Sequence, residues 1–393
     1  MIKKIRGGIT APAGFLAGAT SCGIKNPQAA RDDLSLIVSE TPCSAAATFT
    51  TNVVKAAPVR VSREHLKAGK IRAIVLNSGN ANACTGEDGL KTARRMATAA
   101  AARTGLKANQ VLICSTGRIG VPLPIARIEQ GLKKIPLGRT HSLKCARSIM
   151  TSDTFPKEIA CLVETPKGSF RIGGIAKGAG MIDPNMATML CAVTTDAAIP
   201  QAALRKALRA SVENSFNRIT IDGDMSTNDT VILLANGASG VTPPAEDFQK
   251  ALDGVTQALA RQIVLDGEGV SKFVEIEVVG ARSAKDARRA AEAVANSTLV
   301  KCAWAGGDPN WGRIMGALGY SGAALREDKT AIFYNDLPIV RNGIAASTPW
   351  TKLKAIAARK EFRIKIELAL GRFSHTVWTT DLTEEYVRLN LGE

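Results

Sequence analysis

One threonine in this sequence stands where a chain could cut itself. Thr188 lies in "KGAGMIDPNMATML", a stretch too broken for a regular helix and too irregular for a plain strand. A threonine hydroxyl can attack the carbonyl carbon before it, and hydrolysis of the resulting ester leaves that threonine at a new chain start. The reaction needs a small preceding residue and a strained turn. Ala187 and "GAGMIDPN" meet both needs, so we predict cleavage between Ala187 and Thr188.

After such a cut, Thr188 would carry its own base. A free α-amino group has a pKa of about 7.7–8.0, close to working pH, and can take the proton of the threonine hydroxyl. Metal or serine–histidine chemistry has less support, because the three histidines (His65, His141, His375) have no paired spacing and no GxSxG elbow occurs. We therefore expect no metal site. For Thr188 taken alone, the alternative to a catalytic role is that it is an ordinary hydroxyl residue at the start of a strand.

Four polar loops accompany this stretch. They are "NSGNANACTG", "CSTGRIG", "NRITIDGDMSTNDT" and "GGDPNWGRIMG". Turn residues at this density can hold a ligand through backbone N–H groups, although each loop alone could be a plain turn. Because binding and catalytic residues favour loops on a rigid scaffold, four such loops favour one site assembled from several of them.

The segments that must position these loops alternate between strand and helix patterns, which predicts an α/β or α+β chain. A hairpin is expected over 158–180, with its turn at 166–168, and more sheet with one helix between over 329–371. Strands are expected within 33–40, 72–86, 109–120, 189–199, 230–237 and 272–281. Helices are expected over 87–105, 123–135, 200–216 and 245–269, and 284–306 reads as a helix leading to a strand.

The totals of the 393-residue chain limit the function classes. The net charge is +16, but the positive residues are spread and aromatics make up only 4%. A nucleic-acid-binding protein is therefore a remote alternative, since base stacking needs aromatic side chains. Apolar runs are too short for a membrane span, and Gly and Pro interrupt the segment where a secretory signal would lie. The eight cysteines form no CxxC pair, so we expect mostly buried, reduced thiols and a cytoplasmic protein.

The motif of Thr188 and the polar loops, including "DPNWGRI", strongly resemble the ornithine acetyltransferase (ArgJ) family of arginine biosynthesis. The similarity runs from "ITAPAGFLAGATSCGIK" to "DLTEEYVRLN", which is nearly the whole chain. The resemblance implies cleavage into an α fragment, 1–187, and a β fragment, 188–393. Thr188 would take the acetyl group of N2-acetyl-L-ornithine and pass it to L-glutamate in a ping-pong cycle. It also implies an α+β fold, with sheets between helix layers and a smaller C-terminal domain.

The resemblance also implies site residues and partners. The two fragments would stay together and assemble into α2β2 or larger. No resident cofactor is implied, and acetyl-CoA is a second donor in the bifunctional members, the type we favour on family frequency. Lys177 suits a substrate carboxylate and Glu268 a substrate ammonium, by charge; the plain alternatives are surface charge and helix-end polarity. The oxyanion pair is Thr116 and Gly117, and the substrate-binding residues are Thr154, Lys177, Thr188, Glu268 and Asn390.

Two departures from the family pattern concern ligand contacts. Family members continue past the asparagine to a final Ser or Thr, whereas this sequence ends "NLGE", and Gly307 stands where an acid is common. The catalytic motifs are intact. The alternative enzyme hypothesis is a self-cleaving N-terminal-nucleophile amidase or aminopeptidase. It would share Thr188 but give its acyl group to water instead of glutamate.

Overall fold

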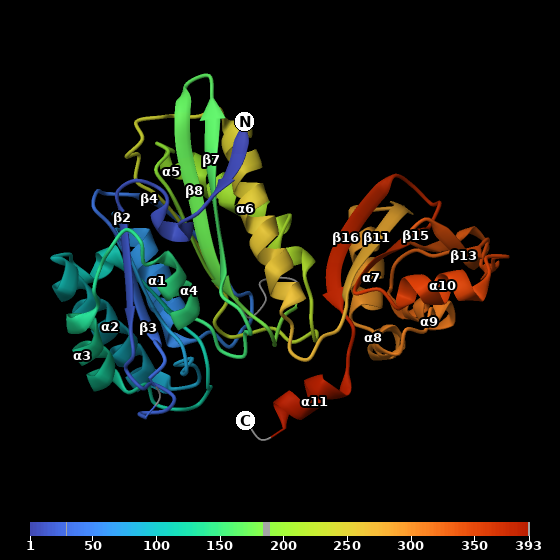
Figure 1. Ribbon diagram of the computed structural model, residues 1–393, viewed down its shortest axis with the longest axis horizontal. Coiled ribbons are helices and arrows are strands. Elements are labelled where there is room, and N and C mark those ends of the chain that lie inside the picture. The colour runs from blue at the N-terminus through green and yellow to red at the C-terminus, as the bar shows by residue number, and fades with distance from the viewer. Residues whose placement is uncertain (29, 184–188, 392–393) are drawn as a thin grey trace. The chain divides into compact units, whose positions relative to one another are not determined.

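Two compact units make up the computed structural model, which describes residues 1–28, 30–183 and 189–391 (Figure 1). Unit 1 consists of Met1–Asn217 and Met225–Ile263, and unit 2 of Arg218–Asp224 and Val264–Glu393. These units do not coincide with the expected fragments 1–187 and 188–393. The boundary between those fragments lies outside the described residues, so the division stays a prediction.

A six-stranded sheet forms the centre of unit 1. Its pairs are antiparallel except for β9 and β10, which run parallel. The hairpin predicted over 158–180 is confirmed, because Thr165 pairs with Gly168 across the turn. In spatial order the strands are β1 (Ile2–Ile5), β7 (Lys157–Thr165), β8 (Gly168–Lys177), β9 (Leu190–Thr195), β10 (Thr230–Ala235) and β4 (Ser44–Phe49).

A four-stranded sheet packs against the first. Its strands are β2 (Phe15–Thr20), β3 (Leu34–Ser39), β5 (Ala73–Asn77) and β6 (Val111–Ser115), in that order. Apolar side chains of both sheets, such as Leu76 and Ile232, share one buried cluster. Strands β5 and β6 run parallel. Their carboxyl ends therefore lie side by side, and so do the loops that follow them.

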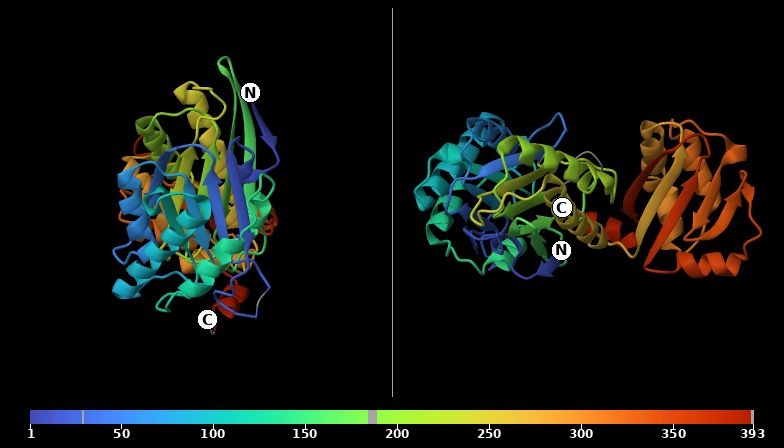
Figure 2. Two further views of the ribbon diagram at one scale, coloured as in Figure 1. Left: turned by 90° about the vertical axis from the view of Figure 1, so that its left-hand side faces the viewer. Right: turned by 90° about the horizontal axis from the view of Figure 1, so that it is seen from above.

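Helices cover the outer faces of the two sheets (Figures 1 and 2). Helices α1 (Ala57–Ala68), α2 (Gly86–Thr104) and α3 (Ile125–Lys134) pack on the four-stranded sheet, and α4 (Ser142–Ser148) contributes to the core between the sheets. Helices α5 (Gln201–Glu213) and α6 (Ala245–Leu265) lie along the six-stranded sheet, where Phe248 meets Phe170 of β8 at 6.1 Å between ring centroids. The expected arrangement of sheets between helix layers is confirmed.

Unit 2 is smaller and has its own sheet and core, which confirms the expected smaller C-terminal domain. Its strands, in spatial order, are β14 (Ile344–Ala345), β13 (Leu337–Arg341), β12 (Ala331–Tyr334), β15 (Glu361–Glu367), β11 (Phe273–Ala281) and β16 (Phe373–Thr380). Its helices are α7 (Ala284–Ala295), α8 (Thr298–Ala305), α9 (Trp311–Tyr320), α10 (Trp350–Ala357) and α11 (Glu384–Asn390). The described chain also contains the 3-10 helices η1 (Gly8–Thr10), η2 (Ala108–Gln110), η3 (Phe216–Arg218) and η4 (Glu327–Lys329).

One sequence prediction is wrong in unit 2. The segment after α7 was expected to be a strand, but it forms helix α8. The hydroxyl of Ser297 accepts a hydrogen bond from the Val300 N–H and begins a new helix after a short break. Trp304 of α8 is completely buried in the core of unit 2. A short apolar run does not by itself distinguish a strand from a buried helix.

The cysteines are only partly buried. All eight are free; four are buried, but Cys84 and Cys302 are exposed, so the expectation of buried thiols holds for only part of the set. Among the residues that the structure describes, helices fall short of the length and apolarity that crossing a membrane requires.

Candidate active site

Ala187 and Thr188 lie outside the described residues, but both flanks of their segment are described. Lys177, the last residue of β8, pairs in register with Leu190, the first residue of β9. The chain therefore leaves the six-stranded sheet and returns to it at neighbouring strand ends.

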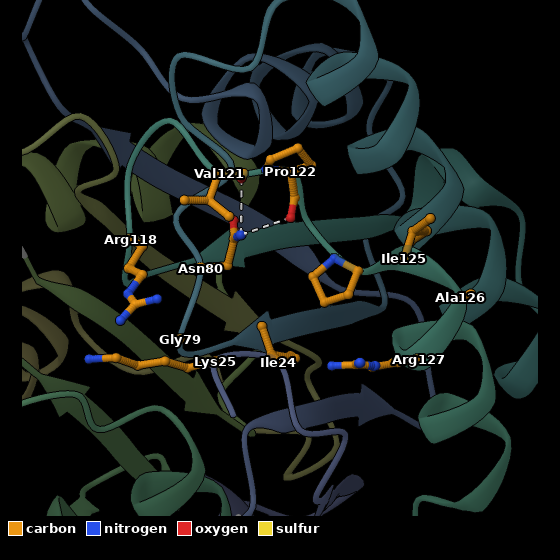
Figure 3. Close-up of a pocket in the computed structure, with 11 residues that line it drawn as sticks. Ile24, Lys25, Gly79, Asn80, Arg118, Val121, Pro122, Ile125, Ala126 and Arg127 are labelled. Carbon is orange, nitrogen blue, oxygen red and sulfur yellow. Dashed lines mark hydrogen bonds between the residues drawn. The ribbon is translucent and has the colours of Figure 1, made fainter. Parts of the chain in front are cut away.

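The loops after β5 and β6 are locked to each other. The Thr116 N–H donates to the Asn77 carbonyl at 3.0 Å, and the Ser115 hydroxyl donates to the Asn77 side chain at 2.6 Å. From the other loop, the Asn80 amide donates to the carbonyls of Val121 (3.0 Å) and Pro122 (3.2 Å), as Figure 3 shows. The polar residues of both loops are thus used to fix one rigid turn.

Gly117 occupies a position in this turn that no side chain fits. Its φ is +128°, and a Cβ there would lie 2.3 Å from the backbone carbon of Gly79 and 2.5 Å from the nitrogen of Asn80. Gly117 is exposed, and its backbone N–H donates to no described residue. A fixed, accessible N–H without an acceptor is what an oxyanion hole requires. The neighbouring Thr116 hydroxyl could supply the second donor.

Lys177 is buried beside Thr116, with only 2% of its surface exposed, so the alternative of a surface charge is wrong. Its Nζ lies 3.5 Å from the Thr116 Oγ1, which accepts from it and keeps its own hydrogen for another acceptor. Burial alone would raise the pKa of the nearby Asp153 carboxyl. The charges of Lys177 and Lys157 and the Gly178 N–H overcome this effect and lower that pKa to about 2.

Asp153 and Lys157 form a fully buried ion pair at 2.6 Å. Removing one partner of a buried pair leaves an uncompensated charge, so Lys157→Met should lower the free energy of unfolding at pH 7 by about 3 kcal/mol. Since the folded pKa of Asp153 is about 2 and the unfolded value about 3.9, its contribution is present above pH 4 and is lost as the pH falls toward 2. Urea unfolding at pH 7 and pH 3 measures both effects.

Lys91→Met is the matched control for this prediction. Lys91 also pairs with an aspartate one helical turn away, Asp88, but both side chains are mostly exposed. An exposed pair contributes about 0–1 kcal/mol, so the control should unfold nearly as the wild type does. If the two variants lost equal stability, the buried pair would not have the role assigned to it here.

A second buried carboxylate lies directly beside the return of the chain into β9. Asp229 is fully buried, and its Oδ1 accepts a hydrogen bond from the Met189 N–H at 3.0 Å. Its Oδ2 has no hydrogen-bond partner among the described residues. Burial raises the pKa of Asp229 well above its usual range, against the opposing effects of the Met189 N–H and the Lys177 charge. The carboxyl that contacts the residue after Thr188 is therefore biased towards its protonated form.

Asp229→Asn should stabilise unit 1 at neutral and alkaline pH. The amide keeps the acceptor for Met189 but has no carboxyl to ionise. In the wild type the unfolded chain loses the Asp229 proton above pH 4 while the folded chain retains it, so stability falls as the pH rises toward the raised folded pKa. Urea unfolding at pH 5 and pH 8 should show this decline in the wild type and a smaller one in the variant, which should gain about 1–3 kcal/mol at pH 8. An equal decline in both proteins would contradict the assignment.

Asn228 joins the start of β10 to the locked turn. Its side-chain amide donates to the carbonyls of Ala81 (2.7 Å) and Ser115 (2.8 Å). The polar residues that precede β10 thus hold three of the site's segments together. The sequence analysis singled out the loop before β10 but did not predict the roles of Asn228 and Asp229. The available signal for these two was the polar run of Thr227, Asn228 and Asp229, immediately before a strand that is apolar after Thr230. The sequence analysis also did not predict the roles of Asp153 and Lys157.

The other predicted substrate residues fall in two places. Thr154 is exposed and follows Asp153 directly in unit 1. Glu268 and Asn390 belong to unit 2, where the Asn390 amide donates to the Glu268 carboxylate at 2.9 Å although 122 residues separate them in sequence. Glu268 is therefore more than a polar residue at a helix end, because Asn390 of α11 holds its carboxylate. The use of all three by one substrate stays a prediction.

The four polar loops are only partly brought together. Residues 77–86, 114–120 and 225–229 are joined in unit 1 by the hydrogen bonds described above. The fourth loop lies in unit 2, and its second half belongs to α9, where the Asn310 side chain accepts from the Arg313 N–H. Among the described residues, no group of three or more His, Cys, Asp and Glu side chains could hold a metal ion.

Comparisons with known proteins agree with the predicted resemblance. The sequence profile of the ArgJ family matches residues 16–392. A Geobacter sulfurreducens protein named arginine biosynthesis bifunctional protein ArgJ is 48% identical, over 96% of this chain and 98% of its own length. A Methanocaldococcus jannaschii protein named glutamate N-acetyltransferase is 43% identical, over 99% of both chains.

Solved structures also match parts of the chain. A crystal structure of arginine biosynthesis bifunctional protein ArgJ from Bacillus halodurans is 37% identical to this chain. It covers 48% of this chain and 98% of its own, with a TM-score of 0.45. The family identification depends on the near full-length sequence relatives. The chain is an enzyme and belongs to the ArgJ family.

Proposed function

We propose that this enzyme transfers the acetyl group of N2-acetyl-L-ornithine to L-glutamate, with Thr188 as the carrier of that group. The observation that carries the proposal is the position of the Thr116–Gly117 turn. It lies beside Lys177, where β8 ends opposite the first residue of β9. Oxyanion donors at that strand end suit a nucleophile one residue before Met189. The names of the relatives in arginine biosynthesis support the substrate assignment.

The first step is self-cleavage. The Thr188 hydroxyl attacks the Ala187 carbonyl carbon, the peptide nitrogen leaves as the amine of Thr188, and an ester links the two residues. Water then hydrolyses the ester and releases the α fragment with a new carboxylate at Ala187. The product is a threonine with a free hydroxyl and a free α-amine.

The second step is acetyl transfer. The α-amine of Thr188 takes the hydroxyl proton while Oγ1 attacks the acetyl carbonyl carbon. The oxyanion is stabilised by the Gly117 N–H and the Thr116 hydroxyl, and a donor of this kind contributes about 3–4 kcal/mol. The carbon–nitrogen bond breaks, and ornithine leaves with the proton. The amine of glutamate then attacks the acetyl ester and restores Thr188.

Substrate recognition in this proposal uses opposite charges. Lys177 would attract a substrate carboxylate and Glu268 a substrate ammonium, while Thr154 and Asn390 would supply neutral hydrogen bonds. We further propose a cytoplasmic enzyme that needs no resident cofactor. Its fragments would remain together and form α2β2 or a larger assembly, as the family resemblance implies. Size measurement on the cleaved protein checks the assembly.

The experiment that tests the proposal has two parts. Intact mass under denaturing conditions should give two fragments of similar size, the second beginning at Thr188. The same sample, given N2-acetyl-L-ornithine and isotopically labelled glutamate, should form labelled N-acetylglutamate and ornithine in equal amounts. Free acetate in place of N-acetylglutamate would identify the amidase alternative. A single 41.4 kDa species would rule out the α-amine mechanism.

A further inference from the structure

One lysine of unit 2 is buried and has no part in the proposed mechanism. Lys301, on helix α8, has only 3% of its surface exposed. Its Nζ donates to the hydroxyl of Thr379 at 3.0 Å, and to the carbonyl and the hydroxyl of Thr380 at 2.5 and 3.2 Å. Both threonines belong to the end of β16. An ammonium group carries three hydrogens, so Lys301 can serve all three acceptors at once.

A lysine in this position costs stability. Among the described residues its hydrogen-bond partners are neutral oxygens, without a paired carboxylate. Burial lowers the pKa of Lys301 to about 7, against the opposing charges of Asp381, Asp222 and Cys302. At neutral pH the unfolded chain therefore holds a proton that the folded chain holds only in part, and this difference lowers stability. A methionine of similar length would avoid that cost, so stability alone is a poor reason for a lysine here.

The strand end that Lys301 holds leads directly into the last helix. Residues 379–383, which we call the junction, connect β16 to α11 (Figure 1). Within the junction, the Asp381 carboxylate accepts from the N–H groups of Ser271 at 2.9 Å and Lys272 at 3.0 Å. The junction is thus fixed on one side by α8 and on the other by the residues that precede β11.

Helix α11 is seated on the segment just before those residues. Thr383, which precedes α11, donates its hydroxyl to the Gly269 carbonyl at 2.5 Å. A Cβ at Gly269 would lie 2.4 Å from the Tyr386 nitrogen, so the two backbones are in direct contact. At the end of α11, the Asn390 amide reaches the Glu268 carboxylate at 2.9 Å. A shift of the junction would therefore move α11 on this seat and separate Asn390 from Glu268.

We infer that Lys301 is a positioning residue for substrate binding, because it fixes the junction from which α11 presents Asn390 beside Glu268. The inference rests on the proposed function, in which this pair contacts substrate. Lys301 takes no part in the chemistry and acts only through the junction. Its loss should weaken substrate binding and leave the chemical step nearly unchanged, since the donors to the oxyanion remain in place.

The test compares Lys301→Met with the wild type by two measurements. Hydrogen exchange, followed by mass spectrometry, should be at least about tenfold faster in the peptide 379–390 of the variant, the effect of losing one or two hydrogen bonds. The KM for N2-acetyl-L-ornithine should rise by a similar factor, whereas kcat should change less than about twofold. A residue that only stabilises the fold would not separate these two constants.

Thr380→Val is a second, milder variant that keeps the lysine. Valine has nearly the shape of threonine but lacks the hydroxyl that accepts from Lys301. Exchange and KM should both change in the same direction as in Lys301→Met, by about two- to fivefold. This variant decides the question if Lys301→Met does not fold, and an unchanged exchange rate or KM would then contradict the inference.

Tyr334→Phe is the control for a general loosening of unit 2. Tyr334 is also buried in the core of this unit, and the change removes the hydroxyl that accepts from the Trp304 Nε1 at 3.3 Å. Exchange of the peptide 379–390 and KM should both stay within about twofold of the wild type. Equal changes in Tyr334→Phe and Lys301→Met would overturn the inference, and so would an unchanged exchange rate or KM in a folded Lys301→Met.

The proposed function fails separately, if the wild type does not transfer acetyl from N2-acetyl-L-ornithine to glutamate. The exchange measurement does not depend on that activity, so it tests the hold of Lys301 on the junction in either case.

Discussion

Thr188→Ala should leave the protein as a single 41.4 kDa chain with no acetyl transfer from N2-acetyl-L-ornithine or acetyl-CoA. Alanine has no hydroxyl to attack the preceding carbonyl, so neither the cut nor the acetyl ester can form. Without the cut there is also no α-amine to act as the base. The loss should exceed about 10⁴-fold, since nucleophile and base are removed together. Denaturing mass spectrometry and the labelled-glutamate assay measure the two losses in one preparation.

Thr188→Ser is the control, because serine keeps the hydroxyl and loses only a methyl group. It should be cleaved and should retain measurable exchange. Urea unfolding of Thr188→Ala should resemble that of the uncut wild-type precursor. Cleavage of the alanine variant at the same bond would show that another group performs the cut, and the proposed mechanism would then be wrong.

Gly117→Ala should lower kcat for acetyl transfer by about 10²–10³-fold, the effect of losing one oxyanion donor. The new Cβ would lie 2.3 Å from the Gly79 backbone, a distance that real contacts do not reach. Either the turn or the Gly117 N–H must shift, and both displace the donor from the oxyanion. KM should change less than kcat, because the interaction is made in the transition state. Steady-state kinetics with N2-acetyl-L-ornithine separates the two constants.

Gly105→Ala is the matched control for the backbone cost. Gly105 ends α2 with a φ of +67°, and a Cβ there would meet nothing within 4 Å. The control therefore carries the left-handed strain of about 1 kcal/mol without a clash near the turn. Its kcat should equal that of the wild type. If Gly117→Ala also kept its kcat, the Gly117 N–H would not be an oxyanion donor.

Elements with strong local signals were predictable from the sequence. The helix over 87–105 has acids in its first turn, an alanine-rich face that is buried, and Gly105 in the left-handed conformation at its end. The 158–180 hairpin follows from two apolar runs around a turn. In both cases the deciding interactions lie within about twenty residues. The prediction of a strand at α8 failed because its apolar run fits either a strand or a helix until the Ser297 cap is considered.

The assembly of the site was not predictable from local pattern. Whether Lys177 is a surface charge or a buried cation depends on Asp153 and Thr116, which approach it only in the folded sheet. The same holds for Asp229, whose burial follows from the parallel pairing of β9 and β10. Long-range register of this kind leaves no periodic trace in the sequence. The resemblance to a family supplied the residues, but not the interactions that fix their charge states.

The strand order of the six-stranded sheet determines what a cut before β9 can separate. Strands β9 and β10 would belong to the new chain, yet they lie between β8 and β4, which both belong to the old one. Parting the two chains would break a ladder of backbone hydrogen bonds on each side at once. If they were made separately, each half would expose unpaired strand edges, which favour aggregation. An intact precursor would instead join them in a concentration-independent, intramolecular reaction, so the peptide bond before Thr188 would serve as a temporary tether for folding.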